Sequence, residues 1–335
     1  MGFRIYNNQL VDNNKKKNKY IKLINAQGQV LHTYQVDNFD NCYIPNQDSY
    51  LPSSNYIING KVYMNTNVLI DSSGLCTCCD SKMMSNEFTF IKSGRLYDYN
   101  KISNRIELLG KLTNLVKVCG QGGCGTEPAM QILLDSNHTA YYRYIGYPSI
   151  SLSNVVDICG QFTRANSWSP YGYYLTSSGV LYGGKGVNIS KLATNAKKIY
   201  CCSDGNGYNG YSFISNDDTW NINGKVVPDL KVSHVTPGPY RKNLVYLYGI
   251  GLEDSCLYCV ECQYTSGANE LQSVTQISSS GWKSISATQY NTGALGIKNG
   301  KVYKIAGKSI QELPDLGNGN IKIEGVNTFL LYCQE

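Results

Sequence analysis

Apolar and polar positions alternate in short runs along this chain, and seven of the runs begin at a turn residue. In the clearest four, glycine precedes the alternation: Gly60–Tyr63, Gly94–Tyr97, Gly179–Tyr182 and Gly300–Tyr303. The weaker copies are Ser136–Tyr141, Asp217–Trp220 and Asp254–Tyr258. A turn residue followed by period-two alternation is typical of a tight hairpin that leads into a strand. Each run therefore predicts a β-hairpin.

The runs recur at a regular distance. The shortest step, from Gly60 to Gly94, is 34 residues, and the longest, from Asp254 to Gly300, is 46 residues. Strand-built repeats of about 40 to 50 residues are typical of propeller blades. We therefore predict an all-β protein, a β-propeller of seven blades that forms a single domain over residues 1–335.

The two ends of the chain are expected to meet in one blade. Residues 1–41 precede the repeats, which occupy residues 42–335. Phe3–Tyr6 and Tyr20–Ile24 both have the composition of strands. We expect these N-terminal strands to complete the blade begun by the C-terminal strand Phe329–Cys333, which closes the ring and hides both terminal sheet edges.

The cysteines follow the same rhythm. Cys78, Cys119, Cys159 and Cys201 lie 41, 40 and 42 residues apart, each in a short apolar run. Three other runs fit the same place in the repeat: Leu244–Gly249, Trp282–Ala287 and Phe329–Cys333. A small, weakly polar residue at a fixed point of each repeat indicates the crowded innermost strand of a blade. Packing then explains these cysteines, because a buried thiol behaves as a small hydrophobe.

One cysteine cluster allows a different interpretation. Cys256, Cys259 and Cys262 have a CxxCxxC spacing, which could suggest zinc or an iron–sulfur cluster. On an extended strand Cys256 and Cys262 share one face while Cys259 points to the other, so the three thiols do not converge. We predict no metal site and keep metal binding as the alternative.

Candidate catalytic motifs are weak. Gly205–Gly210 matches GxGxxG, but a strand pattern follows it where a dinucleotide site requires a helix. Gly307-Lys308-Ser309 lacks the earlier glycine of a phosphate loop, because position 302 is Val302. The sequence therefore predicts no catalytic, cofactor-binding or metal-binding residue and no cofactor. The groups weighed and set aside as structural are His32, His138, His234, Asp217-Asp218 and Glu253-Asp254.

Composition narrows the class of protein. Charged residues make up 16% of the chain and hydrophobic residues 42%, which is enough for a core. The net charge is +6, and part of it comes from Lys15–Lys19. That run could tether nucleic acid, but we interpret it as a solvated turn. The 28 tyrosines against 7 phenylalanines suit both strands and wet contact surfaces.

The N-terminal residues carry no apolar core of a signal peptide, and Tyr6 stands where myristoylation needs Ser or Thr. No stretch approaches the length of about 18 apolar residues that predicts a membrane helix. We expect synthesis in the cytosol, free thiols among the 13 cysteines, and unused glycosylation sequons at Asn137 and Asn188.

The clearest repeat resembles a known family. Val155–Gly160, Tyr171–Thr176 and Val180–Gly184 follow one another as an inner strand, an apolar strand and a strand entered by a glycine turn. This order resembles the regulator of chromosome condensation family of seven-bladed propellers, and the resemblance spans about Asn55 to Cys333. The tryptophan-glycine ending of that family is replaced by Tyr182-Gly183. No matched residue carries the nucleotide-exchange activity of its founding member, so that activity is not implied.

These observations favour a non-enzymatic scaffold that binds other proteins within a larger assembly. Loops rich in Tyr, Asn, Ser and Gly on a rigid frame suit such binding. The Asn, Lys, Ile and Tyr content also suggests an AT-rich genome and hence a viral or phage virion component. The alternatives are a carbohydrate-active propeller enzyme, or a regulator of a small GTPase or of chromatin by family analogy.

Overall fold

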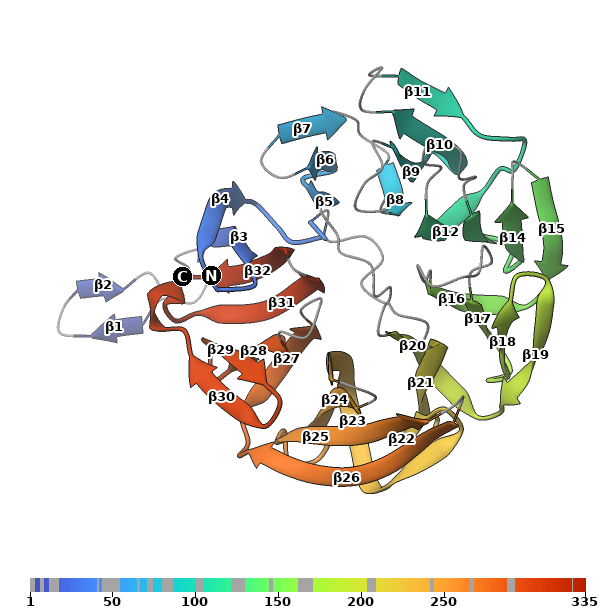
Figure 1. Ribbon diagram of the computed structural model, residues 1–335. Coiled ribbons are helices and arrows are strands. Elements are labelled where there is room, and N and C mark those ends of the chain that lie inside the picture. Colours follow the sequence, from blue (N-terminus) through green and yellow to red (C-terminus); the bar gives the residue numbers. More distant parts are fainter. Residues whose placement is uncertain are drawn as a thin grey trace.

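The computed structural model is a circular array of β-sheets around a common centre (Figure 1). It describes residues 4–6, 9–11, 18–40, 42–43, 55–64, 67–70, 75–79, 87–100, 105–121, 130–144, 147–161, 171–203, 209–241, 244–265, 268–287, 293–326 and 328–335.

Five sheets have four antiparallel strands each. The first three are β8 (Leu75–Cys79) to β11, β12 to β15, and β16 to β19. Their other strands are β9 (Glu87–Lys92), β10 (Arg95–Asn100), β11 (Arg105–Leu108), β12 (Leu115–Gln121), β13 (Met130–Asp135), β14 (Ala140–Tyr144), β15 (Tyr147–Leu152), β16 (Val155–Gln161), β17 (Tyr171–Thr176), β18 (Leu181–Lys185) and β19 (Asn188–Ala193). The fourth sheet comprises β27 (Trp282–Ala287), β28 (Ala294–Lys298), β29 (Lys301–Ala306) and β30 (Ser309–Glu312). The fifth has the order β31 (Asn320–Val326), β32 (Thr328–Gln334), β3 (Lys19–Asn25) and β4 (Val30–Val36).

The remaining sheets depart from four strands. A seven-stranded sheet contains β20 (Ala196–Ser203), β21 (Asn209–Ser215), β22 (Thr219–Ile222), β23 (Lys225–Arg241), β24 (Leu244–Gly251), β25 (Leu257–Thr265) and β26 (Ala268–Ser278). A three-stranded sheet contains β5 (Asn55–Ile58), β6 (Lys61–Met64) and β7 (Asn67–Ile70), and a two-stranded sheet contains β1 (Arg4–Tyr6) and β2 (Gln9–Val11). Among the described residues the one helix is the 3-10 turn η1 (Pro314–Leu316), and no helix there is long and apolar enough to cross a membrane.

All seven predicted hairpins are present. Each predicted turn joins two adjacent antiparallel strands, from β5 and β6 around Gly60 to β28 and β29 around Gly300. The hairpin of β3 and β4, with Gly28 at its turn, is an eighth. The prediction of seven blades is not confirmed, because five sheets have four strands and β23 runs unbroken from β22 to β24 in the seven-stranded sheet.

The five four-stranded sheets and the two halves of the seven-stranded sheet, which we call units, each have a β-bulge in their first strand. In each case the pairing with the second strand skips one residue at the start of the first strand. A bulge turns the strand and leaves one residue outside the ladder. The bulges lie between Leu75 and Thr77, Leu115 and Lys117, Val155 and Asp157, Ala196 and Lys198, Val232 and His234, Trp282 and Ser284, and Asn320 and Lys322.

Backbone hydrogen bonds connect six of these seven first strands to the hairpin turn of the preceding unit. The N–H of the residue that opens the strand donates to a turn carbonyl at 2.8 to 3.1 Å. The six such pairs, donor first, are Leu115 and Gly94, Val155 and His138, Ala196 and Gly179, Val232 and Asp218, Trp282 and Ser255, and Asn320 and Gly300. Because they share these bonds, the hairpin turns and the starts of the first strands lie on one face of the molecule, which we call the turn face.

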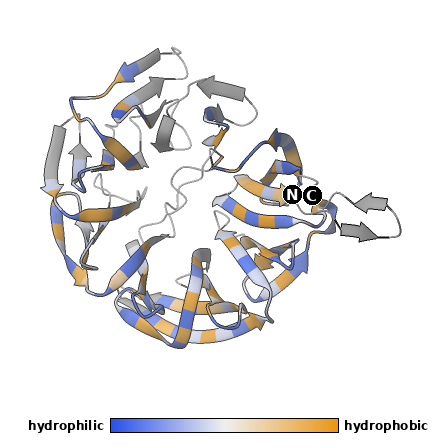
Figure 2. Ribbon diagram, turned by 180° about the vertical axis from the view of Figure 1, so that it is seen from behind, coloured by the Kyte–Doolittle hydropathy of each residue, from blue (hydrophilic) through white to orange (hydrophobic). Residues whose placement is uncertain are grey.

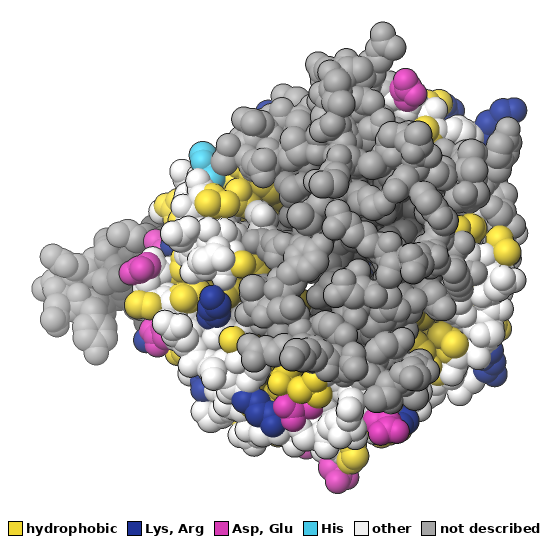
Figure 3. Space-filling view, viewed as in Figure 1, with side chains coloured by type: hydrophobic (Ala, Val, Ile, Leu, Met, Phe, Trp, Pro, Cys, Tyr) yellow, Lys and Arg dark blue, Asp and Glu magenta, His cyan; other side chains and the backbone are white. Residues whose placement is uncertain are grey.

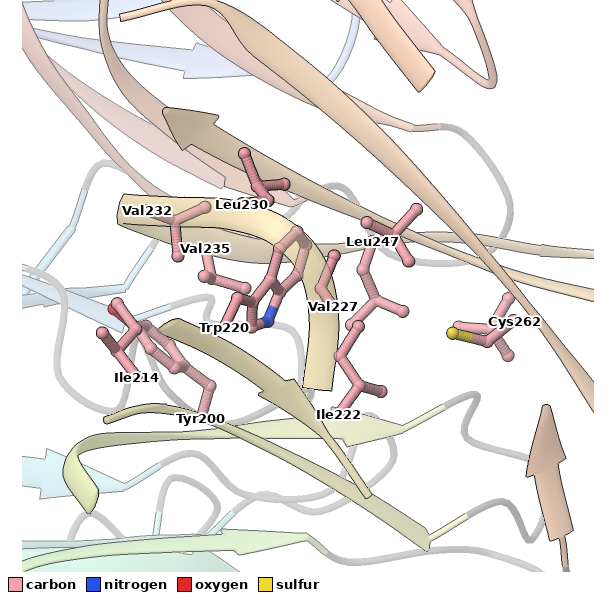
Figure 4. Close-up of a cluster of buried hydrophobic side chains, with 12 residues drawn as sticks. Tyr200, Ile214, Trp220, Ile222, Val227, Leu230, Val232, Val235, Leu247 and Cys262 are labelled. Carbon is pink, nitrogen blue, oxygen red and sulfur yellow. The ribbon is translucent and has the colours of Figure 1, made fainter. Parts of the chain in front are cut away.

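The cores lie between neighbouring sheets. Orange, apolar strands line the contacts between adjacent sheets in Figure 2. One core joins Cys119 and Tyr142 of the β12–β15 sheet to Ile158 and Tyr174 of the next. A core around Trp220 lies between the two halves of the seven-stranded sheet (Figure 4). The indole N–H of Trp220 donates to Ser212 Oγ at 2.7 Å. Each sheet thus buries its apolar faces against its neighbours, as in other repeat architectures.

The terminal sheet combines strands from both ends of the chain. β3 pairs along its whole length with β32, so that Lys19 lies opposite Gln334 and Asn25 lies opposite Thr328. This pairing of Tyr20–Ile24 with Phe329–Cys333 was predicted. The predicted inclusion of Phe3–Tyr6 is wrong for the described residues 4–6, because β1 pairs with β2 in a separate sheet.

Two of the runs expected to be first strands are second strands. Leu244–Gly249 lies in β24, which follows β23 in its sheet. Phe329–Cys333 lies in β32, which follows β31. Trp282–Ala287 is a first strand, as predicted. The error arose because β23 and β31 carry polar residues such as His234 and Glu324 and so lack a continuous apolar run.

The four cysteines do lie in first strands, although they do not share one register. Cys119 and Cys159 each come four residues after the start of the bulge, whereas Cys78 comes three and Cys201 five residues after it. Cys119 and Cys159 are buried, and the side chains of Cys78 and Cys201 lie outside the described part. Cys119 Sγ contacts the carbonyl of Ile158 at 3.5 Å, which suits packing.

Deleting residues 1–36 is expected to abolish cooperative unfolding, because β32 would lose the partner that covers its edge. Deleting residues 1–11 is the matched control, since it removes only the β1–β2 hairpin. Circular dichroism during thermal unfolding measures both. An unchanged transition in the longer deletion would contradict this role of β3 and β4.

Replacing Gly179 by Ala is expected to lower the free energy of unfolding by about 2 kcal/mol, because φ is +77° and the added Cβ would lie 3.1 Å from the carbonyl oxygen of Ala196. Gly307→Ala is the control. Its φ is +60° but no atom lies within 4 Å of the added Cβ, so the expected loss is about 1 kcal/mol. Equal losses in urea denaturation would show that the contact between units does not matter.

Candidate functional site

A groove on the turn face lies where the two halves of the seven-stranded sheet meet. Its volume is about 540 Å³, within the range of pockets that hold small ligands or side chains. We call it the β22–β25 groove. The side from β22 and β23 comprises Thr219, Val226, Asp229, Leu230 and Lys231. The side from the β24–β25 hairpin comprises Gly251, Leu252, Glu253, Asp254 and Tyr258.

A short β22 and a long bulge in β23 shape the first side. Asn221 pairs with Val226 and Thr219 pairs with Lys231, so five steps along β23 match two along β22. Asp229, at the bulge, has a φ of +52°, a left-handed conformation that Asp tolerates better than most residues. The surplus residues protrude and form a wall beside the neighbouring hairpin.

A carboxylate organises the second side. Asp254 Oδ1 accepts the N–H of Cys256 at 2.9 Å, and Asp254 Oδ2 accepts the hydroxyl of Tyr258 at 2.5 Å. Desolvation tends to raise the pKa of Asp254, but these hydrogen bonds outweigh it and lower that pKa below its usual 3.8. The same hydrogen bond raises the pKa of Tyr258 to about 12. Asp254 is therefore ionised at neutral pH and holds the turn in shape.

The absence of a side chain at Gly251 is required by this arrangement. A Cβ there would lie 2.1 Å from Asp254 Oδ1, so any other residue would displace the carboxylate. The N–H of Leu252 donates to the carbonyl of Lys231 at 3.0 Å, which joins the two sides of the groove. Backbone bonds therefore set the width of the groove.

The groove presents apolar side chains to solvent between charged ones. Val226 is 55% exposed and Leu252 is 42% exposed, although both are large aliphatic residues. Lys231 lies 3.9 Å from Glu253, in a pair so exposed that it contributes little to stability. The lining as a whole has three carboxylates and one ammonium group, although the chain has a net charge of +6.

Other first strands add exposed apolar groups to the turn face. The residue inside the bulge is Val116 in β12, Val156 in β16 and Ile321 in β31, exposed by 45%, 41% and 41%. Between β12 and β16, Lys117 and Asp157 form an ion pair of 2.7 Å that holds these strands together. Bulge geometry thus places aliphatic side chains at equivalent points of several units.

Sequence reasoning examined part of this site and assigned it no role. Asp254 was interpreted as a turn residue that bonds its own backbone, and its hydrogen bond to the N–H of Cys256 confirms that interpretation. Asp217 likewise accepts hydrogen bonds from Ser215 and Thr219. The groove itself was missed, because it forms between hairpins separated by more than thirty residues. The run Lys225–Lys231, with charged and apolar residues mixed around Pro228, was the available signal.

The three histidines lie on different sheets, in β4, in the β13–β14 turn and in β23. His138 contacts the carbonyl of Val155 through Nδ1 at 3.3 Å, which is a contact between units. The prediction that no catalytic residue is present stays a prediction.

Within β25, Cys259 and Cys262 point to opposite faces as predicted, whereas Cys256 precedes the strand. Cys262 packs in the core around Trp220, and Cys259 packs in the next core with Trp282. Burial raises the pKa of Cys259 to about 12 and that of Cys262 to about 11, so both thiols are protonated at neutral pH. Within the described residues there is no group of three His, Cys, Asp or Glu side chains arranged to hold a metal ion.

The two sequence motifs also take the predicted local structure where it is described. Asn209 and Gly210, at the end of the GxGxxG match, belong to strand β21, and residues 204–208 lie outside the described part. Gly307-Lys308 forms the turn between β29 and β30. Tyr248 donates its hydroxyl to the carbonyl of Gly307 at 2.9 Å, so this turn contacts the preceding sheet.

Charged side chains of the described residues lie around the rim of the face shown in Figure 3, with basic and acidic groups interspersed. The ion pair of Lys308 and Glu261, at 3.0 Å, connects two neighbouring units. Ion pairs of this kind connect neighbouring sheets through electrostatic attraction.

Comparison with known proteins supports the propeller fold. The chain is similar to the WD40 domain of SCAP from fission yeast, with a TM-score of 0.54 and 8% identity over 94% of this chain and 98% of that one. It is also similar to a chain in the mitotic checkpoint complex, with a TM-score of 0.45 and 12% identity over 79% of this chain and 91% of that one. No family model and no curated protein matches the sequence. The chain is therefore an all-β propeller, and membership of the regulator of chromosome condensation family is not confirmed.

Replacing Tyr258 by Phe is expected to raise the pKa of Asp254, because a hydrogen bond to its carboxylate is lost. A lowered pKa stabilises the fold above pH 3.8 and ceases to do so as the pH falls through the folded-state value. The variant should therefore lose about 1 kcal/mol at pH 7 and less at pH 2.5. Urea denaturation at both pH values tests this, with Tyr182→Phe on β18 as the control. A loss independent of pH would contradict the assignment.

Proposed function

We propose that this chain is a non-enzymatic scaffold that binds other proteins through its turn face, with the β22–β25 groove as a docking site. The observation that carries the proposal is the pair of exposed aliphatic side chains, Val226 and Leu252, in a groove of about 540 Å³. Exposed apolar surface bordered by polar groups is typical of protein interaction sites.

The frame supports this use because it is rigid. We propose that residues 1–335 form one propeller domain, in which residues 1–41 help to close the ring and residues 42–335 supply the repeats. The core that joins Leu23 and Tyr332 to Tyr56 and Ile58 connects the terminal sheet to the sheet of β5. Tyr332 also donates its hydroxyl to the carbonyl of Cys42 at 2.7 Å. A closed ring would hold the docking groups of the turn face at fixed distances from one another.

A scaffold fits the described side chains better than an enzyme does. Asp254 and Asp217 are occupied by hydrogen bonds of their own turns, and Glu261 pairs with Lys308. A glycosidase would instead need two carboxylates facing one another across a substrate. The alternatives of a carbohydrate-active enzyme and of a regulator of a small GTPase or of chromatin have no such observation in their favour.

We place the partner among proteins of a larger assembly, without a membrane or nucleic acid. The interspersed charges of Figure 3 suit protein surfaces better than the continuous basic stripe that nucleic acid requires. Cytosolic synthesis, inferred from the N-terminal residues, and a place in a virion, inferred from composition, stay predictions.

The double variant V226S/L252S should weaken a native complex by about tenfold or more, because two exposed aliphatic side chains are removed from the centre of the contact. The matched control is V187S/V274S, which removes two valines that are 51% and 37% exposed elsewhere.

The measurement is the composition of the tagged protein purified from its own source, determined by size exclusion with light scattering and mass spectrometry. A stoichiometric partner that is lost only in V226S/L252S supports the proposal. A monomer that hydrolyses glycans, or a complex indifferent to both variants, would overturn it.

A further inference from the structure

The β22–β25 groove combines an apolar surface with an excess of negative charge. Its aliphatic side chains are Val226, Leu230 and Leu252, of which Leu230 is buried and the other two are exposed. Tyr258 adds an aromatic ring whose hydroxyl is held by Asp254. A partner residue that enters the groove therefore needs a long apolar stem to cover this surface.

The charged groups that line the groove are Asp229, Glu253 and Asp254, against Lys231 alone. Asp229 and Glu253 are both exposed. Lys231 lies 3.9 Å from Glu253, and its single positive charge balances one carboxylate at most. The net charge of the lining is thus about −2 on a chain that is basic as a whole.

We propose that the partner enters the β22–β25 groove with an extended segment that carries an arginine or lysine next to an apolar residue. This inference rests on the proposed function and adds the chemistry of the partner to it. Arginine and lysine join an apolar stem to a cationic end, so one side chain can contact both Leu252 and the carboxylates. An acidic segment would meet repulsion from the same groups.

Of the three carboxylates, Asp254 holds the shape of the turn, and Asp229 and Glu253 are exposed to a partner. Asp254 is fixed by the Cys256 N–H and by Tyr258, and Gly251 leaves room for it. Glu253 stands beside it at the tip of the hairpin, and its side chain is 81% exposed. Asp229 is on the opposite side, at the bulge of β23. A cationic group between the two sides would approach negative charge from both.

The probe is a peptide of sequence Ala-Leu-Arg-Ala-Leu-Ala with a neutral fluorophore, compared with peptides that have Gln or Glu in place of Arg. Fluorescence anisotropy with the full chain measures binding. We expect the Arg peptide to bind more tightly than the Gln peptide and the Glu peptide to bind least. Raising the salt from 0.1 M to 1 M shortens the screening length from about 10 Å to about 3 Å, so it should weaken the Arg peptide selectively.

The decisive variant is D229N/E253Q, which removes two charges, keeps the shape of both side chains and leaves Asp254 in place. Asn also tolerates the left-handed backbone at position 229. We expect it to weaken binding of the Arg peptide about fivefold. The control D315N/E107Q removes two exposed carboxylates elsewhere and should leave binding unchanged.

The outcomes separate this inference from the proposed function. No binding of the Arg peptide at 1 mM, equal binding of the three peptides, or equal effects of both charge variants would overturn the inference. If V226S/L252S releases a native partner while D229N/E253Q retains it, the docking site stands and the basic chemistry is wrong. If neither variant affects the native complex, the proposed function of the groove fails as well.

Discussion

The structure depends on one backbone contact repeated between neighbouring units. The first N–H of each inner strand donates to a carbonyl in the hairpin turn of the unit before it, as Ala196 does to Gly179. Both sides of the contact require an uncommon conformation. The turn supplies a residue with positive φ, and so does the position just before the inner strand, where Asn114, Asn154 and Asn195 have φ values of 60° to 66°. Glycine and asparagine recur at these points because few other residues adopt that conformation without strain.

The candidate functional groups lie at bulges, where a strand has residues that take no part in this regular contact. The bulge of the inner strand turns one aliphatic residue outward in three units, at Val116, Val156 and Ile321. β23 carries a larger surplus, since it serves two units in succession and bulges at Asp229. The segment at this bulge meets the β24–β25 hairpin, and a groove with both apolar and acidic lining lies between them. The regular part of the repeat holds the frame, and its irregular part provides the candidate site.

The hairpins could be predicted from sequence because turn chemistry is local. Glycine before an alternating apolar–aromatic run identifies the turn at Gly179 without any knowledge of its neighbours. The turn at Gly28 has the same local chemistry, with a φ of +82°. The inner strands β23 and β31 were not recognised from the sequence, because they are stabilised by contacts between units and lack a continuous apolar run of their own. The groove could not be predicted, because it joins Asp229 to Glu253 only in three dimensions.

The sheet of β31, β32, β3 and β4 also constrains the order of events during synthesis. β3 leaves the ribosome about 300 residues before its partner strand β32. Until β32 is made, the apolar residues Ile21 and Leu23, which are fully buried in the folded chain, lack the contacts with Leu330 and Tyr332 that complete their core. β3 can pair with β4 at once, but its other edge stays open until β32 is made, so the terminal sheet is completed only then. A chaperone that covers β3 during translation would act at the point where the nascent chain is most exposed to misassembly.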